Sequence, residues 1–110
     1  MNIKMTAATM RVLRTLLEEP TAPHYGRQLM EATKLQSGSL YPILARLERE
    51  GVIAGEQEDI DPKEAGRPAR RYYKITGEGA RAARQALAEV HELSRVPQGP
   101  WHSGIAPEGT

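Results

Sequence analysis

Four basic side chains surround one predicted turn and strand of this 110-residue chain. Arg67, Arg70, Arg71 and Lys74 lie within residues 66–76, a stretch that contains no acidic residue. The chain as a whole has a formal net charge of only +1, so its composition does not force this local excess. Arginine and lysine bind phosphate oxygens and displace condensed counterions when they do so. The stretch therefore predicts contact with a nucleic-acid backbone through Arg67, Arg70 and Arg71.

A second polar surface opens the helix predicted just upstream. Its N-cap is expected at Ser39, or at Ser37 with an open first turn, because Pro42 is tolerated only near the start of a helix. Serine hydroxyls and the free amides of a helix N-terminus attract phosphate. The ring of Pro42 is also placed to pack on a thymine methyl.

Three further side chains have two interpretations each. The Tyr41 hydroxyl either reaches DNA or packs beneath the helix. Arg46 lies on the exposed face, where it either reaches a guanine edge or a phosphate, or pairs with Glu50 four residues later. Tyr25, at the start of the preceding helix, either donates to a phosphate or packs in the core.

Hydrophobic spacing predicts the elements that position these groups. The first helix follows the N-cap Thr6 and stops before Pro20. The second covers about residues 25–33, with Leu29 and Met30 buried, and the third ends at Gly51. Strands are expected over residues 52–57 and 70–75, joined by an acidic, structureless loop over residues 58–65. A fourth helix, capped by Thr76, then runs to about residue 95.

This order of elements matches a winged helix-turn-helix: mainly helical, with one small β-hairpin, in the order α-α-α-β-β-α. We expect the DNA-binding part to cover residues 1–79, a dimerisation helix residues 80–96 and a flexible tail residues 97–110. The basic arm of the hairpin is expected to face DNA and the acidic arm to face away. In the second strand, Tyr73 and Ile75 alternate with outward-facing residues and should point toward the core.

Four clusters in this order resemble the PadR family of bacterial transcriptional regulators. They are Tyr25-Gly26, Ser39-Leu40-Tyr41-Pro42, Leu44 through Leu47-Glu48 to Gly51-Val52-Ile53, and Gly66-Arg67-Pro68 through Arg71-Tyr72-Tyr73 to Thr76 and Gly79. The resemblance covers roughly residues 8–80. It implies a dimeric, operator-binding regulator, commonly a repressor, whose C-terminal helix helps to form the dimer. In some relatives a small-molecule effector binds near that interface and releases DNA.

The last predicted helix carries small and apolar residues close to a heptad spacing. They are Ala83, Ala86, Leu87, Val90 and Leu93. A chain with five aromatic residues and no Phe has a lean core, and an exposed apolar helix face in such a chain favours a partner. A two-fold homodimer predicts a pseudo-palindromic operator in double-stranded DNA.

Other chemistry finds little support in the residues. The chain has no cysteine, and His24, His91 and His102 are scattered, so neither a metal site nor another cofactor site is expected. Gly77 and Gly79 follow no βαβ unit, which excludes a dinucleotide loop. We therefore expect no enzyme activity, no membrane span and a cytoplasmic, nucleoid-associated protein.

Two alternatives remain open. A winged helix can serve as a protein-interaction module without DNA, although such a module has no reason to keep Arg46, Arg67, Arg70 and Arg71 on one side. A regulator released by an effector at the dimer interface is the other. Trp101 has two interpretations as well, an aromatic platform for a ligand or a loosely held side chain. Its position in the Pro/Gly-rich tail favours the second.

Overall fold

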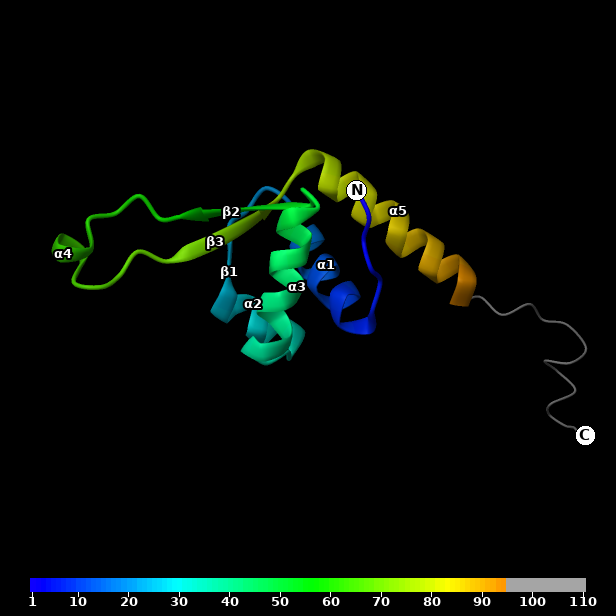
Figure 1. The fold of residues 1–110 in the computed structure, drawn as a ribbon, viewed down its shortest axis with the longest axis horizontal. Coiled ribbons are helices and arrows are strands. Elements are labelled where there is room, and N and C mark those ends of the chain that lie inside the picture. Colours follow the sequence, from blue (N-terminus) through cyan, green and yellow to red (C-terminus); the bar gives the residue numbers. More distant parts are fainter. Residues whose placement is uncertain (95–110) are drawn as a thin grey trace, which may run out of the picture.

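The computed structural model describes residues 1–94, which fold into a helical body from which a β-hairpin projects (Figure 1). In chain order these residues form α1 (Ala7–Glu18), β1 (His24–Tyr25), α2 (Gly26–Thr33), α3 (Ser37–Arg49), β2 (Ile53–Gln57), α4 (Pro62–Ala65), β3 (Arg71–Ile75) and α5 (Gly77–Ser94). The predicted winged helix-turn-helix is confirmed. The predicted tail, with Trp101 and His102, lies outside the described residues.

The sheet has the strand order β1-β3-β2, and both pairs are antiparallel. Tyr73 is central in it, since it lies opposite Gly55 of β2 and His24 of β1. The sequence did not predict β1, because two residues are too short to show an alternating pattern. Its pairing with β3 attaches the start of α2 to the base of the hairpin, which we call the wing (residues 53–75).

One apolar core joins the helices to the base of the wing. Leu29, Tyr73 and Ile75 are buried, as predicted, whereas Met30 is only partly buried. The apolar face of α3 is buried with them. The core consists of Val12, Leu13, Leu16, Leu29, Leu40, Ile43, Leu44, Leu47, Val52, Ile53, Tyr73, Ile75, Ala80 and Ala83. The first turns of α5 therefore belong to the same core as the three preceding helices.

Both predicted threonine caps are present. Thr6 Oγ1 accepts a 3.0 Å hydrogen bond from the Thr9 backbone N–H, and Thr76 Oγ1 accepts one of 2.9 Å from Gly79. The Thr76 hydroxyl also lies 2.8 Å from the Gly51 carbonyl, to which it donates. Thr76 thus connects the beginning of α5 to the turn that follows α3.

The loop at the end of the wing is not structureless as predicted, because it contains the short helix α4. Asp61 caps this helix by accepting from the Lys63 backbone N–H at 3.0 Å, and Pro62 occupies the first turn. Gly66 ends it with a φ of 70°, in the left-handed region that glycine adopts without steric cost. An N-cap, a proline and a terminal glycine were the local signal that the acidic composition obscured.

Gly79 is required where α5 crosses the start of β2. A Cβ at this position would overlap the carbonyl oxygen, the carbonyl carbon and the Cα of Val52. These are backbone atoms, so the overlap cannot be relieved by rotating a side chain. Gly77, two residues earlier, has open space where a Cβ would lie, with no neighbouring atom within 4 Å of that position.

This difference predicts opposite effects of two alanine substitutions in the same helix. Gly79→Ala should lower the free energy of unfolding by about 1–3 kcal/mol, because it overpacks a closed contact. Gly77→Ala should leave it unchanged or raise it by up to about 1 kcal/mol, since alanine loses less backbone entropy on folding. Urea unfolding followed by circular dichroism measures both. Equal stabilities of the two variants would contradict the close contact at Gly79.

Candidate nucleic-acid interface

The exposed face of α3 begins at its N-terminus. Ser37, Ser39, Tyr41 and Pro42 are all exposed, whereas the apolar side chains on the opposite face of the helix lie in the core. The burial of one face therefore determines which side chains the other presents. This is the arrangement required of a helix that enters a DNA groove.

The helix begins earlier than either serine prediction allowed. Gln36 is the N-cap, and its carbonyl accepts from the backbone N–H groups of Ser39 and Leu40 at 3.0 and 2.9 Å. Pro42 is consequently the sixth residue of the helix, where its ring nitrogen cannot donate to the Gly38 carbonyl. The N-cap predictions at Ser37 and Ser39 were wrong, because the rule on proline position was applied too strictly. The Gln36 side chain makes no capping bond to the helix, so the first backbone N–H groups face outward.

Tyr41 lies on the surface rather than beneath the helix. Its side chain is 43% exposed, and its hydroxyl lies against Gly26, where a Cβ would overlap it. The two helices therefore approach closely at Gly26, and the atom that uses the space is the Tyr41 hydroxyl. The crossing places this side chain over the start of α2.

Arg46 does not form the predicted pair with Glu50. The Glu50 carboxylate instead accepts a 2.8 Å hydrogen bond from the Asn2 backbone N–H. Arg46 is half-buried, and its guanidinium has no hydrogen bond or ion pair among residues 1–94. It is therefore available to a ligand.

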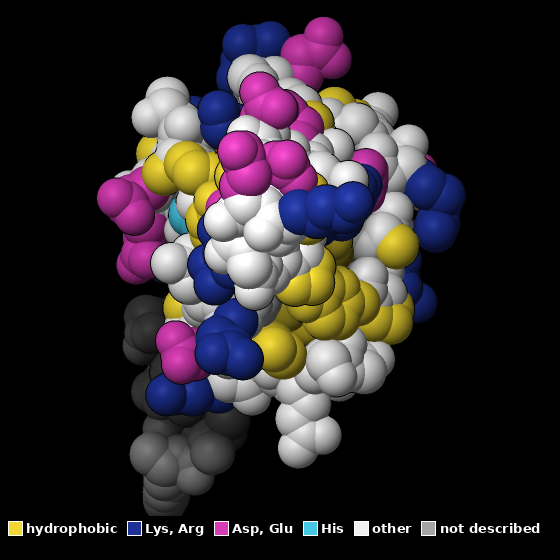
Figure 2. Space-filling view, turned by 90° about the vertical axis from the view of Figure 1, so that its left-hand side faces the viewer, with side chains coloured by type: hydrophobic (Ala, Val, Ile, Leu, Met, Phe, Trp, Pro, Cys, Tyr) yellow, Lys and Arg dark blue, Asp and Glu magenta, His cyan; other side chains and the backbone are white. Residues whose placement is uncertain are grey.

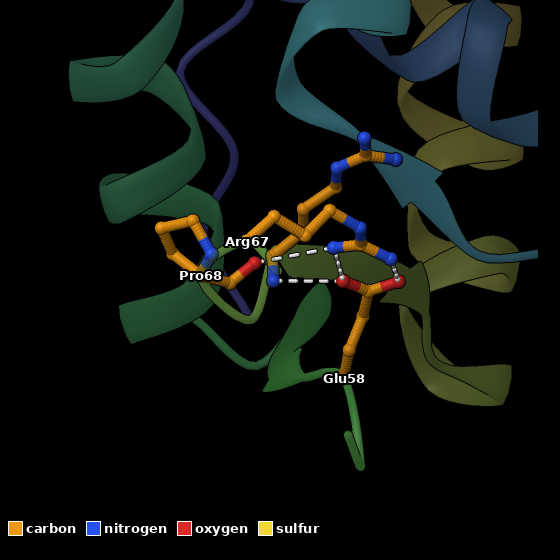
Figure 3. Close-up of polar contacts among 4 residues, drawn as sticks. Glu58, Arg67 and Pro68 are labelled. Atoms are coloured by element: carbon orange, nitrogen blue, oxygen red, sulfur yellow. Dashed lines mark hydrogen bonds and ion pairs between the residues drawn. The ribbon is translucent and has the colours of Figure 1, made fainter. Parts of the chain in front are cut away.

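Arg67 is neutralised by an acid that the sequence pattern placed on the other arm of the wing. Its guanidinium donates to both carboxylate oxygens of Glu58, at 2.7 and 3.3 Å, and the Arg70 backbone N–H donates to Glu58 Oε1 at 2.8 Å (Figure 3). The hydrogen bond from Arg67 and that from the Arg70 backbone lower the pKa of Glu58 to about 2. The same pair raises the pKa of Arg67. The expectation that the acidic arm faces away was wrong for Glu58. This residue joins the two arms of the wing, because it accepts hydrogen bonds from Arg67 and from the Arg70 backbone.

Arg71 is also paired. Its guanidinium lies 2.8 Å from Glu48 Oε2 of α3 and 5.7 Å from the centre of the Tyr73 ring. It crosses Gly55 so closely that a Cβ there would overlap it. Arg71 therefore holds the base of the wing against α3, and Gly55 provides the space.

Arg70 is the wing arginine whose guanidinium stays unpaired. Its side chain is exposed, and within the described part of the chain only its backbone takes part in hydrogen bonds. Three arginines that looked equivalent in the sequence therefore differ in the fold. One closes the loop, one joins the wing to α3, and one is left for a partner.

Tyr25 and Tyr72 form the junction between α2 and the wing. Their ring centres lie 5.8 Å apart, inclined at 55°, and the Tyr72 hydroxyl donates to Glu56 at 2.9 Å. This hydrogen bond to a carboxylate raises the pKa of Tyr72. Tyr25 is half-buried, so part of its surface remains exposed at the interface.

Several residues of this surface were missed from the sequence. Glu48 and Glu58 neutralise two of the predicted DNA contacts, and Arg27 of α2 adds a cation opposite the wing. No local pattern pairs residues so far apart. Only Arg27 carried a signal, as a basic residue in the first turn after Tyr25-Gly26.

The five residues predicted to form a dimer face on α5 differ in their exposure. Ala83 is fully buried in the core of its own chain, so including it in an interface between chains was wrong. Ala86, Leu87 and Val90 are half-buried, while Leu93 is 85% exposed. The apolar surface left for a partner therefore lies in the second half of the helix.

The side chains around these elements carry both signs of charge. Figure 2 views the molecule along the wing and shows acidic and basic side chains together at its projecting end, with a hydrophobic area beside them.

Within residues 1–94, no group of three or more His, Cys, Asp or Glu side chains could hold a metal ion. No helix in the same range is long and apolar enough to cross a membrane.

Comparison with known proteins identifies the family. The model of the Transcriptional regulator PadR-like family matches residues 13–85. Transcriptional regulator Rv3488 of Mycobacterium tuberculosis is 39% identical over 77 residues, which are 70% of this chain and 66% of that protein. The chain thus spans slightly less than two thirds of the length of this relative.

Solved structures agree in fold. An X-ray structure of a PadR-like transcription factor from Bacteroides fragilis superposes with a TM-score of 0.62 at 26% identity, covering 79% of this chain and 85% of the other. NadR in complex with 4-hydroxyphenylacetate gives 0.61 at 27% identity, covering 81% and 57%. The matched family, the Mycobacterium tuberculosis relative and the Bacteroides fragilis protein are described as transcription regulators, not enzymes, in agreement with the expectation for this chain. Since the family match extends from α1 into α5 and includes the whole wing, the chain belongs to the PadR-like family of transcriptional regulators.

Proposed function

We propose that this protein binds double-stranded DNA in a sequence-specific manner, with α3 in the major groove and the wing on the adjacent backbone. The observation that carries the proposal is the exposed polar N-terminal half of α3, together with the unpaired guanidinium of Arg46, in a chain of this family. Ser37 and Ser39, at the helix N-terminus, contact phosphate, and Tyr41, Pro42 and Arg46 reach base edges or the backbone. Tyr25 supports the same contact from the start of α2.

The three arginines of the wing contribute to DNA binding to different extents. Arg70 contacts a phosphate directly, because its guanidinium forms no hydrogen bond or ion pair among the described residues and interacts with Glu58 only at longer range. Arg67 and Arg71 first serve to hold the wing in place, and they reach DNA only by exchanging Glu58 or Glu48 for phosphate. The net charge delivered to DNA is therefore smaller than the count of arginines suggests.

We further propose that the protein is a homodimer that acts as a repressor in the cytoplasm, on the nucleoid. The exposed apolar residues at the end of α5, above all Leu93, support a two-fold contact between copies of this helix. Two-fold symmetry requires a pseudo-palindromic operator with its half-sites about one helical turn apart, or a multiple of that distance. A protein bound there excludes polymerase from an overlapping promoter.

A small-molecule effector is a second candidate partner. A cavity of about 300 Å³ lies between the N-terminal residues and α5, lined by Met1, Asn2, Ile3, Ala82, Gln85, Ala86 and Glu89. It borders the proposed dimer face, and the solved structure of NadR contains 4-hydroxyphenylacetate. Calorimetric titration with that compound tests this candidate.

The DNA proposal is tested with a duplex copy of the DNA upstream of the protein's own gene, titrated by fluorescence anisotropy beside a scrambled duplex. Tighter binding to the first duplex, falling steeply with salt, is expected. Weak and equal binding to both would favour the protein-interaction module instead.

Removing the unpaired guanidiniums of Arg46 and Arg70 should flatten the salt dependence. For Arg46→Gln combined with Arg70→Gln, we expect the slope of log K against log salt to fall by roughly 1.8, since each phosphate contact contributes about 0.9. Arg81→Gln combined with Arg84→Gln, on the exposed face of α5, removes the same charge and serves as the control. Identical slopes for the two double variants would exclude these contacts.

Dimerisation should depend on the end of α5. Val90→Asp and Leu93→Asp are expected to give monomers in analytical ultracentrifugation, because an unpaired charge in an apolar contact is costly. Ala88→Asp, at an exposed position of the same helix, should remain dimeric. If the first two variants sediment as dimers, the interface lies elsewhere.

The Glu58–Arg67 pair predicts a pH dependence. The folded-state pKa of Glu58 lies near 2, below its ordinary value of 4.5, so the pair contributes stability above about pH 4.5 and loses it as the pH falls toward 2. In an NMR titration the Glu58 carboxyl should titrate near pH 2, and in Arg67→Gln it should titrate clearly higher. Lys63→Gln removes a charge from α4 of the same wing and should leave the titration of Glu58 unchanged. An unaltered titration in Arg67→Gln would contradict the pair.

A further inference from the structure

A groove with cationic and aromatic walls lies between α2 and the wing. Its larger part is a cavity of about 430 Å³ lined by Tyr25, Arg27, Gln28 and Arg70. A second cavity of about 280 Å³ shares three of these residues and adds four: Gly26, Tyr41, Arg71 and Tyr73. Because they share a wall, we treat the two cavities as one site, the α2–wing groove. Its larger part is of the size that small-molecule sites have, roughly 300–1,000 Å³.

Neither of the two exposed arginines of this groove has a direct ionic partner, although Glu58, which is paired with Arg67, acts on Arg70 at longer range. Arg27 and Arg70 are exposed, and neither guanidinium forms a hydrogen bond or ion pair with any other residue in the range 1–94. Arg71 contributes little, since Glu48 neutralises it. None of the described residues that line the two cavities is acidic. Two free guanidiniums on opposing elements therefore face one space, which suits an anion with several oxygens.

The neutral part of the lining supplies further donors and a planar wall. Tyr25 and Tyr41 carry hydroxyl groups and aromatic rings. Gln28 Oε1 accepts from the Tyr25 backbone N–H at 3.4 Å, which leaves the amide N–H groups of Gln28 as donors. Donors and cations thus outnumber acceptors, as expected of a site for a phosphate group.

The walls of the groove are held in place. Tyr25 pairs with Tyr72 in the sheet and packs on its ring, so the start of α2 is attached to β3. Arg70 lies three residues after Arg67, and its backbone N–H donates to Glu58, the partner of Arg67. Gly26 lets Tyr41 lie across the first turn of α2. A site with fixed walls loses less entropy when it binds its ligand.

We infer that the α2–wing groove binds one phosphate ester between Arg27 and Arg70. Two sources share this chemistry. One is a backbone phosphate of the DNA duplex, and this arm rests on the proposed function. The other is a free nucleotide, whose base would lie on the tyrosine wall and which would exclude DNA from the wing.

The experiment compares wild type with Arg27→Gln, and uses Arg14→Gln as the matched control. Arg14 is exposed on α1 and lines neither cavity. In the duplex arm, anisotropy titrations at several salt concentrations should show that Arg27→Gln lowers the salt slope by about 0.9 and the affinity by roughly tenfold. Arg14→Gln should change neither value. Arg70→Gln, on the opposite wall, should reproduce the loss seen with Arg27→Gln.

The second arm titrates adenosine 5′-monophosphate into the protein by calorimetry, with adenosine as the control. Binding of the nucleotide that is lost in Arg27→Gln, with displacement of the duplex, identifies a free phosphate ester as a ligand. A reduced salt slope without nucleotide binding identifies the backbone phosphate as the only one. Either result supports the groove.

The inference is overturned if Arg27→Gln behaves like Arg14→Gln with the duplex and the nucleotide does not bind. In that case steep, sequence-dependent binding of the duplex by wild type would leave the proposed function intact. Failure of wild type to bind any duplex would instead remove the proposed function, and the nucleotide arm would then decide alone whether the groove binds a phosphate ester. Melting temperatures of the variants show whether they are folded, and no change is expected because both arginines are exposed.

Discussion

The burial of one face of α3 is the constraint on which the rest of the molecule depends. Leu40, Ile43, Leu44 and Leu47 occupy the centre of the core, between α1, α2 and the sheet. Burying such side chains contributes roughly 1.5–3 kcal/mol each relative to leaving them exposed. This sets the rotation of α3 about its own axis. Its polar face must then point outward, so a requirement of folding also creates the proposed recognition surface.

The wing is positioned by a different kind of interaction. Apart from its base, where Ile53, Tyr73 and Ile75 enter the core, it has little apolar contact with the body (Figure 1). The Arg71–Glu48 pair and the Tyr25–Tyr72 contact join it to α3 and α2. Exposed ion pairs contribute little stability, at most about 1 kcal/mol, but they can fix a direction. Thus the same arginines that suit phosphate also orient the wing.

The last helix combines two roles along its length. Its first turns close the core through Ala80 and Ala83, where small side chains and Gly79 permit close approach to the backbone of Val52. Farther along, Leu87 and Val90 are only partly covered, and Leu93 is almost fully exposed. A single apolar pattern therefore serves the chain's own core first and a partner afterwards. The α2–wing groove lies away from this helix, so the proposed contacts with phosphate and with a second copy use different surfaces.

The sequence alone determined the order of the four long helices and the two long strands, and the inward face of most of them. These depend on local signals: the caps at Thr6 and Thr76, the spacing of leucines in α3 and the alternation of Tyr73 and Ile75. It also carried the resemblance to the PadR family, because the four motifs occur in order. Three features were not predicted: the two-residue strand β1, the helix α4 and the N-cap at Gln36. Each is too short, or has too weak a local signal, to be found from hydrophobic periodicity.

Only the tertiary structure decided which arginine is free. Arg67, Arg70 and Arg71 are nearly identical in local context, yet Glu58 neutralises the first and Glu48 the third across 9 and 23 residues. It likewise decided that Ala83 belongs to the core and that Arg27 faces Arg70 across the α2–wing groove. The physical reason is that an ion pair or a cavity depends on distances between chain segments. Periodicity describes one segment at a time and does not contain those distances.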